Sequence, residues 1–188
     1  LGLNLKTYYV KRCVAVPGDT FEIRNAHYKV YGYKGTLGCV DSQDKLLQIL
    51  SIGEERNWSI VMKGFPRDSL VNWTIKDFGP LYIPAKGGRI WMTPVNGVLY
   101  RNAIEWEQKK KLVQRGDIFL LNDSIIQEYQ FKEDYYFVAG DKVMNSKDSR
   151  YWGLLPEKFI VGKATLIWKS VDLNTDEIRW NRVFKRIE

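Results

Sequence analysis

The stretch Tyr8-Tyr9-Val10-Lys11-Arg12-Cys13-Val14-Ala15-Val16-Pro17-Gly18-Asp19 joins an apolar run to a turn. Its first nine positions are rich in β-branched and aromatic residues, which strands favour. The Pro-Gly-Asp sequence that follows is typical of turns. The stretch therefore predicts a β-strand over residues 8–16 and a turn at residues 17–19.

Similar runs recur along the chain, separated by Gly, Pro, Asn and Asp. They lie at Tyr28 to Tyr33, Ser59 to Met62, Gly88 to Met92, Ile118 to Leu121, Tyr135 to Ala139 and Phe159 to Trp168. Their even spacing favours a mostly β fold. Helical periodicity is confined to Gly97 to Leu112, with Asn96 as a candidate cap, and to a shorter segment, Asp44 to Leu50. The sequence thus predicts a mostly β protein with one or two short helices.

The composition is that of a globular protein, because 45% of the 188 residues are hydrophobic and 27% are charged. No apolar run approaches the roughly 18 residues of a membrane-spanning helix. Lys and Arg exceed Asp and Glu by 29 − 22 = 7. An excess of this size is typical of a solvated surface, so we expect no nucleic-acid partner, although a basic β-barrel that binds single strands is an alternative.

Cysteine and histidine are scarce. Cys13 and Cys39 have no metal-ligand spacing, so we expect neither a metal nor another cofactor. We predict that both thiols are free and buried, although an extracytoplasmic location would permit a disulfide. The one histidine, His27, makes a Ser-His-Asp arrangement hard to build, and we expect it at the surface.

A second stretch, Gly140-Asp141-Lys142-Val143-Met144-Asn145-Ser146-Lys147-Asp148-Ser149-Arg150-Tyr151-Trp152-Gly153, crowds small and charged residues into one segment. Together with residues 11–19 it resembles the two C-terminal signature blocks of bacterial type I signal peptidases. That family consists of membrane-anchored serine proteases with a Ser/Lys dyad. The second block matches at Gly140, Asp141, Asn145, Ser146, Asp148, Ser149, Arg150 and Gly153.

The resemblance implies a role for each charged residue of the blocks. Lys11 corresponds to the general base, and Ser146 to the serine that hydrogen-bonds this lysine. Ion pairs are implied between Arg12 and Asp141, and between Asp148 and Arg150. An alternative is that Ser146 is itself the nucleophile, because a Ser/Lys dyad needs only an adjacent base.

A lysine acts as general base only in its neutral form. At the ordinary lysine pKa near 10.4, about one side chain in a few thousand is neutral at pH 7. Alternation along the first predicted strand places Lys11 on the same face as Tyr9 and Cys13, with Val10 and Val14 on the other. We therefore expect both faces of this strand to be buried.

The resemblance also implies an architecture. A catalytic core, formed here by residues 1–24 and 131–188, is interrupted by a mainly β insertion over residues 25–130. The nucleophilic serine of the family lies upstream of the lysine in a Ser-x-Met-x-Pro context, which does not occur here. We interpret the sequence as a C-terminal fragment that lacks the anchor and the nucleophile, and expect it to be inactive alone.

For the full-length protein, the resemblance implies a serine endopeptidase that removes signal peptides from exported preproteins. It needs no cofactor, is anchored in the inner membrane, and has its catalytic domain on the extracytoplasmic side, against the lipid surface. The segment Lys142-Val143-Met144 departs from the Asn-Arg pair and following polar residue that are usual in the family. This departure favours an alternative, a divergent non-catalytic paralogue that binds exported polypeptides. Trp152 and Trp168 are predicted to be structural.

Overall fold

The computed structural model describes residues 8–52, 63–172 and 175–187. The described residues form two compact units, one comprising Lys11–Phe159 and the other the described parts of Leu1–Val10 and Ile160–Glu188. The strand predicted at Ser59 to Met62 lies outside the described residues. The domain boundaries implied by the resemblance stay a prediction.

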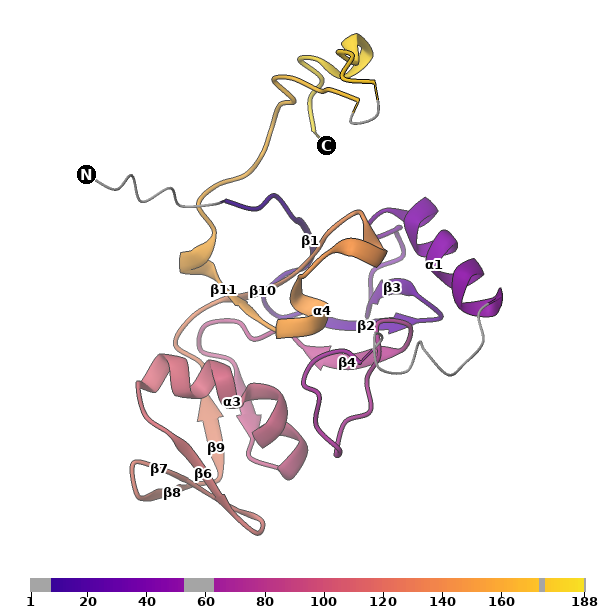
Figure 1. Ribbon diagram of the computed structural model, residues 1–188. Coiled ribbons are helices and arrows are strands. Elements are labelled where there is room, and N and C mark those ends of the chain that lie inside the picture. The colour runs from indigo at the N-terminus through magenta and orange to yellow at the C-terminus, as the bar shows by residue number, and fades with distance from the viewer. Residues whose placement is uncertain (1–7, 53–62, 173–174, 188) are drawn as a thin grey trace, which may run out of the picture. The chain divides into compact units, whose positions relative to one another are not determined.

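The larger unit contains most of the secondary structure. Its strands are β1 (Arg12–Ala15), β2 (Thr20–Arg24), β3 (His27–Val30), β4 (Phe78–Tyr82), β5 (Arg89–Trp91), β6 (Leu112–Arg115), β7 (Ile118–Leu121), β8 (Ser124–Ile126), β9 (Glu128–Gln130), β10 (Tyr135–Ala139) and β11 (Leu155–Pro156). Its helices are α1 (Val40–Ile52), α3 (Pro94–Gln108), η1 (Val143–Asn145), α4 (Ser149–Trp152) and η2 (Glu157–Phe159) (Figure 1). The fold is mostly β, as predicted from the evenly spaced strand-like runs.

All pairings between these strands are antiparallel, and they form four small sheets in the orders β1-β10-β11, β3-β2-β4, β5-β9 and β6-β7-β8. The first sheet joins the two signature stretches, because Arg12 lies opposite Ala139 and Cys13 opposite Val138. β1 is shorter than the predicted strand over residues 8–16. Residues 140–153 then follow directly from the end of β10.

Aromatic side chains connect the first two sheets. The ring of Phe21 in β2 stacks on that of Phe137 in β10, with centroids 4.4 Å apart, and Phe78 of β4 contacts both. A second buried cluster contains Leu46 of α1 and Val143 of η1. The core therefore ties α1 and the β2-β4 sheet to the segment that carries the candidate site.

Helix α3 begins three residues before the predicted start. Thr93, and not Asn96, is the cap, because the Thr93 hydroxyl accepts a hydrogen bond from the Asn96 amide at 3.1 Å and Pro94 occupies the first turn. The helix ends at Gln108, since Lys109 has a left-handed backbone with φ 56°. Leu112 belongs to β6. The lysines at 109–111 follow the helix and are exposed.

The smaller unit has little regular structure among its described residues. It contains η3 (Trp180–Arg182) and two isolated bridges, Leu166–Arg186 and Val171–Ile178. The strand predicted over residues 159–168 is therefore wrong, because this run has no continuous partner. Trp168 is 72% exposed and Trp152 40%, so neither is a core residue, although the Trp168 ring meets that of Phe184 edge-on with centroids 5.0 Å apart. Within the described ranges, no helix combines the length and apolar character needed to cross a bilayer.

Glu107 of α3 fixes the loop that leads into β10. Its carboxylate accepts hydrogen bonds from the hydroxyls of Tyr129 and Tyr135, at 2.6 and 2.9 Å, and from the amides of Lys132 and Glu133. We expect Glu107→Ala to lower the free energy of unfolding by about 1.5–3 kcal/mol, because these donors lose a charged acceptor. Urea denaturation measures the change. Glu133→Ala, in the same loop, is the control, and an equal loss there would contradict the prediction.

Candidate active site

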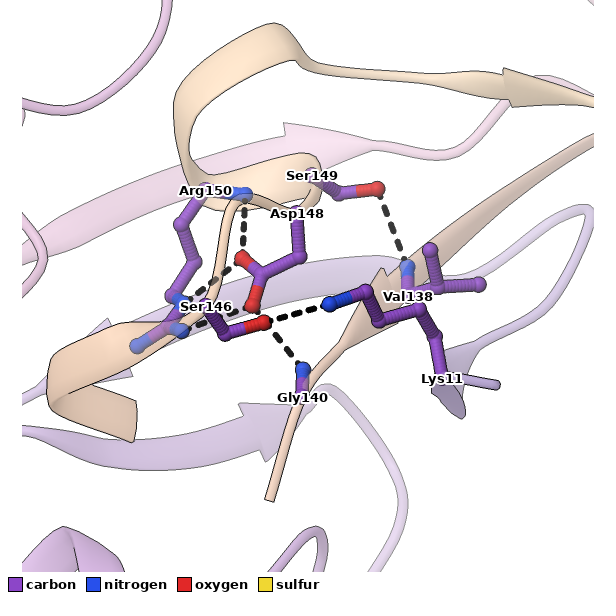
Figure 2. Close-up of polar contacts among 7 residues, drawn as sticks. All are labelled: Lys11, Val138, Gly140, Ser146, Asp148, Ser149 and Arg150. Atoms are coloured by element: carbon purple, nitrogen blue, oxygen red, sulfur yellow. Dashed lines mark hydrogen bonds and ion pairs between the residues drawn. The ribbon is translucent and has the colours of Figure 1, made fainter. Parts of the chain in front are cut away.

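The Nζ atom of Lys11 donates a hydrogen bond to the Oγ atom of Ser146 over 2.7 Å, although 135 positions separate them (Figure 2). Lys11 lies immediately before β1, and Ser146 follows η1 in the loop that leaves β10. The β1-β10 pairing brings these segments together. The two residues that the sequence predicts to form a functional pair are thus in direct contact.

Gly140 leaves room for this contact. A Cβ atom built there would overlap Ser146 Oγ, lie 2.7 Å from Ser146 Cβ and stand 3.4 Å from Lys11 Nζ. Nothing but a hydrogen atom fits at this point of the backbone. The sequence identifies Gly140 as a motif match, but its role follows only from the folded chain, which shows what lies beside its α-carbon.

We expect Gly140→Ala to displace Ser146, to lengthen the Lys11–Ser146 separation beyond 3.5 Å, and to cost about 1–3 kcal/mol of stability from overpacking. A crystal structure of the variant and its urea denaturation curve measure both effects. Gly162→Ala is the matched control, because a Cβ atom there meets nothing within 4 Å. An unchanged Lys11–Ser146 bond in the Gly140→Ala variant would show that this contact does not require glycine at position 140.

Asp148 and Arg150 form an ion pair with no exposed side-chain surface. Nε of Arg150 donates to Oδ1 of Asp148 at 2.8 Å, and Nη2 donates to Oδ2 at 2.7 Å. Oδ2 also accepts from the Gly140 amide at 2.9 Å. Burial alone would raise the pKa of Asp148, but the bonds and charge of Arg150, with bonds from Gly140 and Ser146, hold this pKa below its ordinary value.

Two further contacts hold the loop against β10 and β1. Ser149 is buried, and its Oγ accepts a hydrogen bond from the Val138 amide at 3.0 Å (Figure 2). Arg12 and Asp141 form the ion pair implied by the resemblance, with Nε–Oδ1 and Nη2–Oδ2 distances of 2.9 and 3.0 Å. The second pair is exposed to solvent, so it contributes much less to stability than the buried pair.

The environment of Lys11 differs from the prediction. Tyr9, Val10 and Cys13 are exposed and Lys11 is partly exposed, whereas Val14 and Ala15 are buried, so only the end of β1 is covered. β1 lies at the edge of its sheet, in the order β1-β10-β11. The predicted burial of the Cys13 thiol is therefore wrong. Both cysteines are free, as predicted.

The unusual segment at 142–144 divides between surface and core. Lys142 is exposed, whereas Val143 is 2% exposed and packs with Ala26, Leu46 and Ile75. An apolar side chain at 143 is therefore accommodated by the α1 side of the core. Among the described residues, no group of three or more His, Cys, Asp or Glu side chains could hold a metal ion.

Residues 4–169 match the family described as signal peptidase, peptidase S26, and the chain belongs to this family. It is 29% identical to signal peptidase I of Buchnera aphidicola subsp. Acyrthosiphon pisum over 183 residues, which cover 93% of this chain and 54% of the relative. It is 46% identical to signal peptidase I of Aquifex aeolicus over 164 residues, or 86% of this chain and 57% of the relative.

A shorter match, to signal peptidase I of Haemophilus influenzae, reaches 46% identity over 65 residues, which are 32% of this chain and 19% of the relative. The chain spans about half the length of the curated relatives that it matches over most of its own length.

Proposed function

We propose that the full-length protein is a serine endopeptidase that removes signal peptides from exported preproteins, with Lys11 as general base and a nucleophilic serine upstream of these 188 residues. The observation that carries the proposal is the 2.7 Å bond between Lys11 Nζ and Ser146 Oγ. Membership of the signal peptidase family supports the reaction and the substrate class.

The hydrogen bond to Ser146 gives Lys11 a defined orientation. The Ser146 hydroxyl accepts this bond from Lys11 Nζ. A neutral amine that donates one N–H to Ser146 keeps its lone pair free for another group. In the proposed mechanism this lone pair takes the proton of the attacking serine, and the resulting ammonium later protonates the leaving amine.

The partial exposure of Lys11 suits a site that is completed when the substrate binds. A peptide that covers Lys11 and the exposed start of β1 would exclude water and favour the neutral lysine. Strand addition at an edge is one such binding mode, and the described residues leave the β1 edge of the β1-β10-β11 sheet unpaired. We further propose that a membrane anchor places this site on the extracytoplasmic side of the inner membrane, against the lipid surface.

The test is cleavage of a labelled preprotein by the full-length natural protein in detergent, with the cut site read by mass spectrometry. Cleavage after small residues supports the proposal. No cleavage by well-folded protein, combined with retained binding of the preprotein, would instead support a non-catalytic paralogue, for which the unusual Lys142-Val143 segment is the motivating observation.

Ser146→Ala separates a supporting role from a nucleophilic one. If Ser146 orients Lys11, we expect the full-length variant to keep measurable cleavage, with kcat reduced about ten- to a hundredfold, because the lysine loses its hydrogen-bond partner. Ser124→Ala, at an exposed position of β8, is the control. Complete loss of cleavage together with loss of covalent labelling by a serine-directed inhibitor would identify Ser146 as the nucleophile.

A further inference from the structure

Two polar atoms in the interior of the larger unit have no hydrogen-bond partner in the described part of the chain. They are the hydroxyl of Tyr28, in β3, and Nη1 of Arg150, in α4. Tyr28 is 7% exposed and Arg150 is 0% exposed. An unpaired buried group costs about 1–3 kcal/mol, and more where the group is charged, so a partner is expected for both atoms.

The remaining donors of the Arg150 guanidinium are occupied. Nε and Nη2 both face Asp148, and Figure 2 shows the third nitrogen on the side away from that carboxylate. Nη1 carries two N–H groups, whereas the Tyr28 hydroxyl can donate one hydrogen bond and accept others. A small molecule that can both accept and donate hydrogen bonds could therefore bond to both groups.

The fold places these two residues in neighbouring parts of one core. The amide of Tyr28 donates to Oε1 of Gln43 in α1 at 3.0 Å, and α1 packs against η1 through Leu46 and Val143. Tyr151, beside Arg150, packs on that same cluster. The β3-α1 region therefore lies against the segment that carries Arg150.

The electrostatic influence of the two groups on each other agrees with this placement. Burial raises the pKa of Tyr28 to about 12, and the positive charge of Arg150 opposes the rise. Burial opposes the charge of Arg150, but the hydrogen bond with Asp148, followed by the influence of Tyr28, raises the pKa of Arg150 above its ordinary value. The groups are near enough to interact, yet neither is the other's hydrogen-bond partner.

We propose that a buried water molecule bridges Tyr28 Oη and Arg150 Nη1, and that Tyr28 is thereby a positioning residue for the Arg150–Asp148 pair. The water accepts an N–H bond from Nη1 and donates to the phenol oxygen. Water fits better than an anion, because Asp148 already neutralises the guanidinium and a second negative charge would be repelled.

The bridge would connect the β2-β3 hairpin to the candidate active site. Arg150 holds Asp148, whose Oδ2 holds the Gly140 amide, and Gly140 lies against Ser146 and Lys11. Without the water, the guanidinium of Arg150 would be held only by its two hydrogen bonds to Asp148, and the contacts that depend on this pair would be less rigid. The catalytic part of this inference rests on the proposed peptidase function, whereas the water itself does not.

A high-resolution crystal structure of the 188-residue chain tests the water directly. We expect one ordered water within about 2.7–3.2 Å of both Tyr28 Oη and Arg150 Nη1. A direct bond between the two side chains, or the absence of water density between them, would overturn the proposal. This measurement needs no variant and no activity.

Tyr28→Phe tests the positioning role, with Tyr100→Phe as the matched control. Tyr100 is also buried, but its hydroxyl donates to the Tyr82 carbonyl at 2.9 Å. We expect Tyr28→Phe alone to shift the side-chain NMR signals of Arg150 in the chain. In the full-length protein it should lower kcat about three- to tenfold with KM unchanged, less than a misplacement of about 1 Å can cost.

Unchanged Arg150 signals in Tyr28→Phe, or equal changes in Tyr100→Phe, would overturn the positioning role. If the full-length wild-type protein fails to cleave preproteins, the proposed function fails, while the crystallographic and NMR results still decide the fate of the water bridge. An NMR shift in Tyr28→Phe without any change in kcat would overturn the catalytic part alone.

Discussion

Lys11→Ala is expected to lower kcat/KM for preprotein cleavage by the full-length natural protein about a thousandfold or more. General-base catalysis contributes about 10²–10⁴ in rate, and loss of one member of a catalytic unit removes nearly the whole contribution of that unit. The methyl side chain of alanine can neither accept the serine proton nor bond to Ser146. Single-turnover cleavage of a labelled preprotein measures the loss.

Lys147→Ala is the matched control, because this lysine is exposed in the same loop, next to Ser146. It should cleave within about twofold of wild type, since an exposed charge at this position contributes little. Substantial cleavage by Lys11→Ala, with the control and wild type equally active, would exclude Lys11 as the general base and leave the Lys11–Ser146 bond a structural contact.

Asp148→Asn is expected to lower the free energy of unfolding of the 188-residue chain by about 3–5 kcal/mol. The reason is that Arg150, with no exposed surface, would keep its positive charge without a counter-ion. Urea denaturation at pH 7 measures this. Glu128→Gln breaks the exposed Arg89–Glu128 pair and should cost less than about 1 kcal/mol. A similar small loss in Asp148→Asn would contradict the argument.

The effect of Asp148 should depend on pH with a definite sign. Its folded-state pKa lies below the ordinary aspartate value of about 3.9, so its stabilisation is fully present above that value. The stabilisation is lost as pH falls through the lower, folded-state pKa. The difference in stability between wild type and Asp148→Asn should therefore shrink below about pH 4. A constant difference between pH 7 and pH 3 would contradict this.

Sequence patterns predicted some of the strands, whereas β2, β4 and β6 are paired in sheets and lie outside the predicted runs. β7 and β10 lie where apolar runs end at turn residues, and β1 falls within its predicted run. The run at 159–168 has a similar composition but forms only an isolated bridge at Leu166. Composition shows that a segment can enter a sheet, whereas a strand also needs a partner edge. Whether such an edge is available depends on the whole fold.

The resemblance implied both the residues of the candidate site and their pairings, whereas the packing around them could not be predicted. The Lys11–Ser146, Arg12–Asp141 and Asp148–Arg150 contacts are present as the resemblance implied. The covering of β1 was predicted wrongly, because alternation identifies the two faces of a strand and does not show whether anything packs on each. The space required at Gly140 likewise depends on a residue six positions later in the chain.

The pairing of Arg12 with Ala139 has a consequence for how this protein can change over evolutionary time. The ladder holds both ends of the intervening polypeptide a few ångströms apart, so its length has little influence on the geometry of the site. Because closure entropy grows only slowly with loop length, segments could be added or removed inside this interval at modest energetic cost. Insertions and deletions between Arg12 and Ala139 can therefore accumulate without changing the geometry of the candidate site.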